Sequence, residues 1–192
     1  VVNEEHVVEG VHWGDAHASE MERWVQDLAW GEGGMMDTLR PAFQFMNDLF
    51  SMRSRGHHEM RDFHRMYEKH TDEEESVEDE LRVTADFLVE ACRDYCETVV
   101  VPSNHDRHLN RWLNEADFRL DPLNAKFFCL AQYAVLDAMD RGDRDYNVLE
   151  WGLHHVRSQE AVLAEVRFLG DDESFVIARD SGGKGGIEEG LH

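Results

Sequence analysis

A run of four β-branched residues, Thr98-Val99-Val100-Val101, follows directly on a long amphipathic segment, and this order constrains the fold strongly. Residues 76–92 carry apolar side chains at helical spacing and begin with Ser76-Val77-Glu78-Asp79, which resembles a capping box. The run that follows is typical of a strand buried on both faces. A helix that leads into a central strand predicts an α/β sheet.

Other short apolar segments repeat this alternation along the chain. Residues 7–11 and 42–46 predict strands, although a short helix also fits the second. Residues 165–169 and 174–178 predict a hairpin around Gly170-Asp171-Asp172. Further helices are predicted over residues 19–30, 123–139 and 147–156. We therefore expect a layered β-sheet flanked by helices, with ligands beyond the carboxyl ends of its strands.

The composition fits one folded domain over residues 1–192, because 42% of the residues are hydrophobic despite a formal net charge of -22. No apolar run approaches the roughly 18 residues of a membrane span, and no basic-then-apolar leader opens the chain. The expected location is therefore the cytoplasm, or the host cytoplasm for a viral protein. An acidic surface repels nucleic acid at long range, which disfavours a plain polyelectrolyte binder, and it suits a salty habitat.

Three other features have ordinary structural explanations. The block at residues 72–80 holds seven carboxylates in nine positions and is expected to be a solvated loop and helix start. Residues 181–186 form a glycine-rich loop without the residue order of a P-loop. An odd number of cysteines without metal-binding spacing indicates free thiols in a reducing compartment. These are Cys92, Cys96 and Cys129.

Polar side chains collect where the predicted strands end. Asp15 and His17 follow the first strand, Asp48 follows the second, and Asn104-His105-Asp106 follows the third. Taken singly, Asp15 could cap a helix, Asn104 could be a turn residue and His105 an ordinary loop histidine. Together, carboxylate, imidazole and amide groups suit Mn, Fe or Zn, whereas a structural zinc finger would need thiolates. The strand ends therefore predict a metal site.

On these residues the chain resembles the calcineurin-like metallophosphoesterase superfamily, whose motifs run D-x-H, G-D-x-x-D, G-N-H-[DE], a lone His and G-H-x-H. Gly14-Asp15-Ala16-His17 matches the first motif, and Ser103-Asn104-His105-Asp106 matches the third with serine in place of glycine. Asn47-Asp48-Leu49-Phe50-Ser51 stands at the second position without the glycine or the second Asp. Asp48 is the expected residue there, with Asp37 as the alternative.

Within this superfamily the chain is similar to the phage early-gene phosphoesterases implicated in host DNA breakdown, which are distant relatives of the nucleases of double-strand-break repair. The stretches that carry this similarity span nearly the whole chain. They are residues 36–41, 55–58, 76–80, 103–106, 167–169 and 173–175.

The resemblance implies a metallophosphoesterase-like fold and a site for two divalent metal ions, manganese first, with Fe, Zn, Mg or Ni as alternatives. Asp15 and His17 would hold the first ion, Asp48 would bridge, and Asn104 would bind the second. His105 would be the general acid for the leaving oxygen, and Asp106 would orient its ring.

The end of the chain departs from the family pattern. The sequence stops at Gly190-Leu191-His192 and contains no G-H-x-H. His192 is the candidate for the lone His, a ligand of the second metal. We therefore expect a C-terminal part of the domain to be missing and the isolated chain to turn over poorly.

A basic segment precedes the acidic block and could contact substrate. Arg55, His57 and His58 lie among further arginines and could neutralise a nucleic-acid backbone at the mouth of the site. A solvated segment that pairs with the neighbouring carboxylates is the alternative.

The expected function is that of a metal-dependent phosphodiesterase or nuclease, with DNA as the expected substrate. A phosphomonoesterase or protein phosphatase of the same fold is an alternative, because the motifs position a phosphate and do not select what is attached to it. A non-enzymatic acidic interaction protein, for example a DNA mimic, is the alternative of another class. No membrane partner is expected, and a homodimer is left open.

Overall fold

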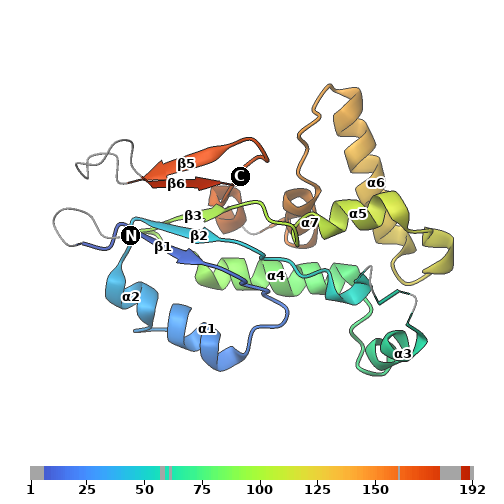
Figure 1. The fold of residues 1–192 in the computed structure, drawn as a ribbon, viewed down its shortest axis with the longest axis horizontal. Coiled ribbons are helices and arrows are strands. Elements are labelled where there is room, and N and C mark those ends of the chain that lie inside the picture. The colour runs from blue at the N-terminus through green and yellow to red at the C-terminus, as the bar shows by residue number, and fades with distance from the viewer. Residues whose placement is uncertain (1–6, 57–58, 61, 160, 178–186, 191–192) are drawn as a thin grey trace.

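A computed structural model describes residues 7–56, 59–60, 62–159, 161–177 and 187–190 of the chain, with the side chains of the last segment not described. Figure 1 shows a small sheet at the centre, with helices below it and a two-stranded ribbon above it. The architecture is therefore α/β, as the alternation of apolar segments predicts.

The central sheet has four strands, all parallel, in the order β1-β2-β3-β4. Gly10 of β1 lies opposite Phe43 of β2, which lies opposite Glu97 of β3. The strands are β1 Gly10–Trp13, β2 Phe43–Met46, β3 Glu97–Val100 and β4 Arg167–Phe168. The strand at residues 42–46 is confirmed, and the helix alternative there is wrong.

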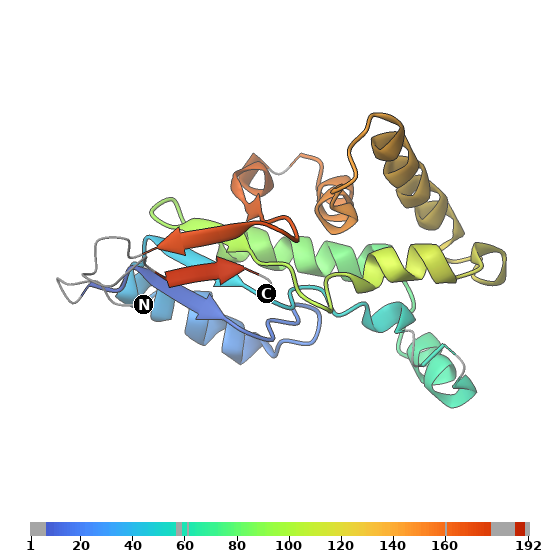
Figure 2. The same cartoon turned by 45° about the horizontal axis from the view of Figure 1, so that its top comes forward.

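Two apolar cores cover the two faces of this sheet. Met46 and Val100 belong to the larger core, which the helices complete. Phe45 and Val99, which alternate with them along the strands, pack with Ile177 on the other face. Both views of the fold place the β5–β6 ribbon over this second face (Figures 1 and 2). Burial on both faces explains the nearly continuous apolar sequence of β2 and β3.

The structure confirms the helices predicted over residues 76–92, 123–139 and 147–156 and contains further ones. Helices α4 Val77–Ala91, α6 Ala125–Asp140 and α7 Val148–Val156 lie where the spacing predicts them, and the side chain of Ser76 accepts a hydrogen bond from the Asp79 N–H. Helix α1 Arg23–Trp30 begins later than the predicted residue 19. Elements that the periodicity did not indicate are α2 Met35–Leu39, η1 Arg53–Arg55, α3 Phe63–Thr71, α5 His108–Glu115, η2 Phe118–Leu120 and η3 Ala161–Glu165. None of the helices in the described part of the chain is long and apolar enough to cross a membrane.

The predicted hairpin at residues 165–178 is wrong. Strand β4 pairs in parallel with β3, whereas β5 Ser174–Ile177 pairs antiparallel with β6 Ile187–Gly190 in a separate sheet. The physical reason is burial, because Phe175 and Ile177 of β5 pack over the face of the central sheet. The glycine-rich segment 181–186 lies outside the described residues.

The acidic block is not wholly solvated as expected. Glu80 is buried, and its carboxylate accepts hydrogen bonds from the N–H groups of Arg53 and Ser54, both at 2.8 Å, and from the Ser19 hydroxyl. This carboxylate fixes η1 against α4. Without such donors, burial of a charged group would be unfavourable.

Candidate metal and phosphate site

The ends of three parallel strands bring the predicted polar residues to one edge of the sheet. The loops after β1 and β2 continue side by side beyond the strands, since the N–H of His17 donates to the Asp48 carbonyl at 2.7 Å and that of Ala16 to the Asn47 carbonyl at 3.1 Å. The loop after β3 carries Asn104 and His105 to the same edge. Segments far apart in sequence therefore meet here because the sheet is parallel.

His17 lies at the centre of this group. Its Nε2 is 3.9 Å from a carboxylate oxygen of Asp15, and its ring centroid is 4.8 Å from that of His105 in an edge-on arrangement. The ring of His108, the first residue of α5, lies 4.9 Å beyond His105. The other ring nitrogen of His17, Nδ1, is 3.0 Å from the Ser51 hydroxyl. Ser51 thus fixes the ring and leaves Nε2 directed toward Asp15.

Three of the predicted ligands have left-handed backbone conformations. The φ angles of Asp15, His17 and Asp48 are 49°, 38° and 50°. Such values are uncommon for residues other than glycine, and they cluster at functional sites where the surrounding structure holds them. Arg40, Met52 and Glu73, which lie elsewhere, also have positive φ angles, so the backbone supports the site only together with its side-chain geometry.

Asp106 ties the third loop to the second. One of its oxygens accepts a hydrogen bond from the Phe50 N–H at 3.1 Å, and the other accepts one from the Ser103 hydroxyl at 2.7 Å. The Ser103 oxygen also accepts from the Asp106 N–H at 3.2 Å. Burial raises the pKa of Asp106 to about 6, although the hydrogen bonds from Ser103 and Phe50 oppose this shift. Ser103, which departs from the glycine of the family motif, therefore closes the loop onto Asp106.

Asp106 was expected to orient the ring of His105, but it accepts no hydrogen bond from Nδ1 of that ring. Nδ1 of His105 is buried and has no hydrogen-bond partner among the described residues. The carboxylate of Asp106 instead faces Ser103 and Phe50, because those buried donors need an acceptor. Asp106 positions the loop, and its expected role in orienting His105 through this nitrogen is wrong.

The expected substrate contact of Arg55 is also wrong. Its guanidinium is buried and donates two hydrogen bonds to Asp121, at 2.7 and 2.9 Å, and one to the Ser54 carbonyl. With these partners it is not free to bind a phosphate. His57 and His58, predicted beside it, lie outside the described residues, as does His192.

The alternative ligand Asp37 is engaged elsewhere. Its carboxylate accepts hydrogen bonds from the Gly33 N–H at 2.9 Å, the Arg93 guanidinium at 3.2 Å and the Tyr95 hydroxyl at 3.1 Å. These bonds, that from Gly33 first, hold the pKa of Asp37 below its ordinary value. Asp48 follows β2 directly, and its backbone carbonyl accepts a hydrogen bond from the N–H of His17.

The donor set can be tested against the needs of a metal ion. Among the described residues, no three or more His, Cys, Asp or Glu side chains form a ready-made cluster for an ion. Two ligands of one ion can nevertheless lie up to about 4.2 Å apart, given metal–ligand bonds of roughly 2.1 Å. The Asp15–His17 separation of 3.9 Å is within this limit, and Nε2 of His17 is available because Nδ1 is held by Ser51. These two side chains therefore lie within reach of one ion and form part of a ligand set.

Most of the chain can be aligned with a known phage protein. The chain is 33% identical to "Protein A1" of Escherichia phage T5 in an alignment of 188 residues, which covers 95% of the chain. The chain resembles a phage protein. It spans about a third of that relative, 32% of its length, and the relative's printed name states no activity. No protein-family model matches the chain, and no solved structure matches it.

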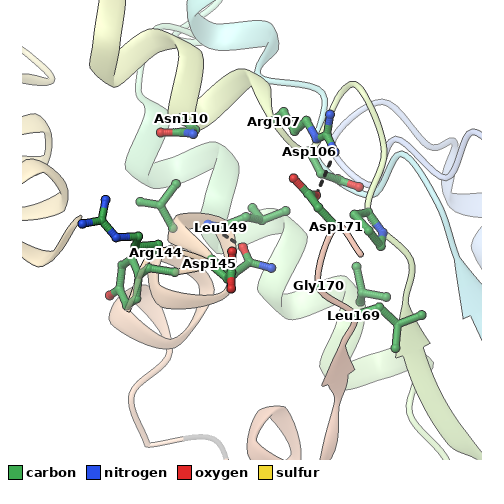
Figure 3. A pocket seen from close by; sticks show the side chains of 14 residues that line it. Asp106, Arg107, Asn110, Arg144, Asp145, Leu149, Leu169, Gly170 and Asp171 are labelled. Atoms are coloured by element: carbon green, nitrogen blue, oxygen red, sulfur yellow. Dashed lines mark hydrogen bonds and ion pairs between the residues drawn. The ribbon is translucent and has the colours of Figure 1, made fainter. Parts of the chain in front are cut away.

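A pocket that the sequence did not indicate lies beside this group of residues. Figure 3 shows it between the loop after β3, the start of α5, the segment before α7 and the loop after β4. Asp106, Arg107 and Asn110 line it from one segment of the chain. Arg144 and Asp171, which lie further along the sequence, complete its polar wall. Sequence reasoning could not find this pocket, because three separate segments of the chain form it. The position of Arg107 next to the third motif was the one signal.

Proposed function

We propose that the chain is the phosphate-binding part of a metal-dependent phosphodiesterase with a metallophosphoesterase-like fold, and that its substrate is DNA in the cytoplasm of a phage-infected cell. In this proposal the chemistry is hydrolysis of a phosphodiester at the common edge of β1, β2 and β3. The observation that carries it is the arrangement of His17, whose free Nε2 lies 3.9 Å from the Asp15 carboxylate and whose ring contacts that of His105.

The residues have distinct roles in this proposal. Asp15 and His17 would hold the first of two divalent ions, manganese being the first candidate, with Asp48 as the bridging carboxylate and Asn104 as an amide ligand of the second. When bound, such ions supply charge neutralisation on the phosphate and activation of a water. His105 would donate a proton to the leaving oxygen.

The backbone supports these roles. Left-handed φ angles at Asp15, His17 and Asp48 persist only where the surrounding contacts hold them, here the hydrogen bonds between the two loops. A site preorganised in this way does not have to reorganise its ligands when phosphate binds. The choice of DNA among phosphate esters rests on the resemblance to phage phosphoesterases, while the phage relative supports only the phage setting.

The test compares hydrolysis and metal binding in one set of variants. With added Mn²⁺ the chain should cleave bis-p-nitrophenyl phosphate and plasmid DNA, slowly because its sequence lacks the G-H-x-H motif. His17→Ala should lose both Mn²⁺ binding, measured by calorimetry, and this cleavage. His105→Ala should keep Mn²⁺ binding and lose turnover by about 10²- to 10⁴-fold. His70→Ala, which removes an exposed histidine on α3, is the matched control.

Two outcomes would contradict the proposal. Unchanged Mn²⁺ affinity in His17→Ala would remove the metal site from this edge of the sheet. Faster hydrolysis of p-nitrophenyl phosphate than of the diester would replace the nuclease by a phosphomonoesterase on the same site.

A further inference from the structure

The pocket beside the candidate site has a volume of about 190 Å³. Pockets for drug-sized ligands are larger, roughly 300–1,000 Å³, so a single nucleotide unit is nearer to what this one can hold. Its floor is apolar, from Val100, Leu149 and Leu169, whereas its rim carries charged and amide side chains. A ligand with one flat apolar part and separate polar ends matches this lining.

The position of the pocket relates it to the cleavage site. Asp106 lines the pocket and also ties the loop after β3 to the loop after β2. Arg107 follows Asp106 in the chain, two residues after His105, and faces the pocket from the N-terminal end of α5. The pocket therefore adjoins, through the loop after β3, the residues to which the proposed function assigns the cleaved phosphate.

One end of the pocket suits a phosphate. The guanidinium of Arg107 is 2.8 Å from the carboxylate of Asp171, and the two side chains are 46% and 64% exposed (Figure 3). Ion pairs as exposed as this are weak, so a phosphate can replace the Asp171 carboxylate. Arg144, on the other side of the pocket in Figure 3, has no ion pair with a residue that the structure describes. The pocket thus holds two arginines in a chain with 19 basic and 41 acidic residues.

The other end suits a base. Asp145 lies away from the Arg107–Asp171 pair in Figure 3, and its carboxylate has no hydrogen bond or ion pair within the described part of the chain. A carboxylate accepts a hydrogen bond from the amino group of cytosine, whereas thymine offers only its N3–H, which is flanked by the O2 and O4 carbonyl oxygens that repel a carboxylate. The half-buried ring of Tyr146 beside it offers a face for stacking.

We propose that this pocket is a nucleotide subsite, in which Arg107 binds a backbone phosphate next to the cleaved one and Asp145 accepts a hydrogen bond from the amino group of the base. Its place along the substrate strand rests on the proposed nuclease function. Binding of a free nucleotide does not, because it needs neither metal nor hydrolysis.

The experiment measures nucleotide binding by calorimetry in the presence of EDTA. The chain should bind deoxycytidine monophosphate about tenfold more tightly than thymidine monophosphate, as expected for one well-placed hydrogen bond to a base. Arg107→Gln should weaken both by about tenfold or more, because a charge-assisted bond to the phosphate is lost. Asp171→Asn should tighten both, since it releases Arg107.

Asp145→Asn tests the base end separately. An asparagine can donate to thymine O4 as well as accept from the cytosine amino group, so the preference for cytosine should disappear while phosphate binding remains. The matched control is Arg111→Gln, which removes an arginine of similar exposure, 47%, from the same helix but outside this pocket. It should bind both nucleotides as the wild type does.

The outcomes separate this subsite from the proposed function. Equal binding by wild type, Arg107→Gln and Arg111→Gln, or no binding at millimolar nucleotide, would overturn the subsite, whatever the hydrolysis assay shows. Arg107-dependent binding without Mn²⁺-dependent hydrolysis would leave a nucleotide-binding pocket and remove the nuclease. Circular dichroism of each variant distinguishes lost binding from lost fold.

Discussion

At the scale of single residues, hydrogen bonds made within the fold decide which predicted site residues are free to bind a ligand. Asp106 is occupied by Ser103 and the Phe50 N–H, and Arg55 by Asp121. Asp15, by contrast, has a carboxylate that is 85% exposed. A residue of the right chemical type in the right part of the sequence can contribute to a site only if the fold has not already used its hydrogen bonds.

The role of Asp106 as a loop tie predicts a difference between two substitutions. Asp106→Ala should lower the free energy of unfolding by about 1–3 kcal/mol, because it leaves the Phe50 N–H and Ser103 hydroxyl without their acceptor. Asp106→Asn keeps an acceptor and removes a carboxylate that burial disfavours, so its loss should be smaller. Urea unfolding monitored by circular dichroism measures both, and equal losses would contradict this role.

The Arg55–Asp121 pair predicts a pH-dependent effect on stability. Burial alone would raise the pKa of Asp121, but the hydrogen bonds from Arg55 and Asn124 outweigh it and hold that pKa below its ordinary value. The pair therefore stabilises the fold above the ordinary pKa of aspartate, about 3.9, and this contribution is lost as the pH falls through the lowered folded-state value.

Arg55→Met should consequently cost about 3–5 kcal/mol at pH 7, because it leaves a buried carboxylate without its cation. The cost should shrink below about pH 4, where the unpaired carboxyl group can take up a proton. Unfolding curves of both proteins from pH 7 to pH 3 measure the difference. If the variant is as stable as the wild type but binds DNA less tightly, the original expectation of a substrate contact is restored.

At the scale of elements, the buried side chain of Gln44 joins two helices, α1 and α4, and strand β3 to β2. The amide of Gln44 donates to the Ala91 carbonyl at 2.9 Å and to the Thr98 hydroxyl at 2.8 Å, and its oxygen accepts from the Trp30 indole N–H at 3.0 Å. Gln44 thereby fixes α1 and the end of α4 against β2 and β3. Because these strands carry the candidate ligands, this network also sets the position of the site.

Gln44→Leu should therefore destabilise the chain, even though the volume and apolar character of leucine suit a core. The substitution leaves the indole N–H of Trp30 and the carbonyl of Ala91 buried without partners, at about 1–3 kcal/mol for each group. Thermal unfolding followed by near-ultraviolet circular dichroism, which reports on Trp30, is the measurement. Gln159→Leu, at an exposed position after α7, is the control and should have little effect.

At the scale of the whole molecule, charge opposes both compactness and the proposed substrate. The net charge of -22 is spread over a surface on which most carboxylates are exposed. Paired arginines neutralise only part of it, as in the Arg23–Glu90 and Arg157–Asp86 pairs. Local cations, and in our proposal metal ions, must therefore overcome the long-range field for DNA to approach.

Added salt should stabilise the chain for the same reason. Raising NaCl from 0.1 to 1 M shortens the Debye length from about 10 to about 3 Å and screens the repulsion among surface carboxylates. Each kcal/mol so gained should raise the melting temperature by about 2–4 °C for a chain of this size. Differential scanning calorimetry is the measurement, and a melting curve insensitive to salt would contradict this account.

The sequence by itself determined the α/β class, β3, the helices α4, α6 and α7, and the polar residues at the strand ends. It predicted the first strand at residues 7–11, whereas β1 is Gly10–Trp13, and it left residues 42–46 open between a strand and a short helix. The features that it determined follow from local periodicity and from β-branched and capping residues, which act over a few positions in the chain. Sequence also placed Asp48 rather than Asp37 at the site, through its position after a strand.

Only the tertiary structure decided what depends on contacts between distant segments. The separation of β4 from β5 follows from the need to cover both faces of the sheet, and the burial of Glu80, Gln44 and Arg55 follows from donors and acceptors that lie at least 14 residues away. The pocket around Arg107 and Asp145 exists because three segments that are distant in sequence meet there. No local pattern encodes such meetings, since they depend on how the whole chain packs.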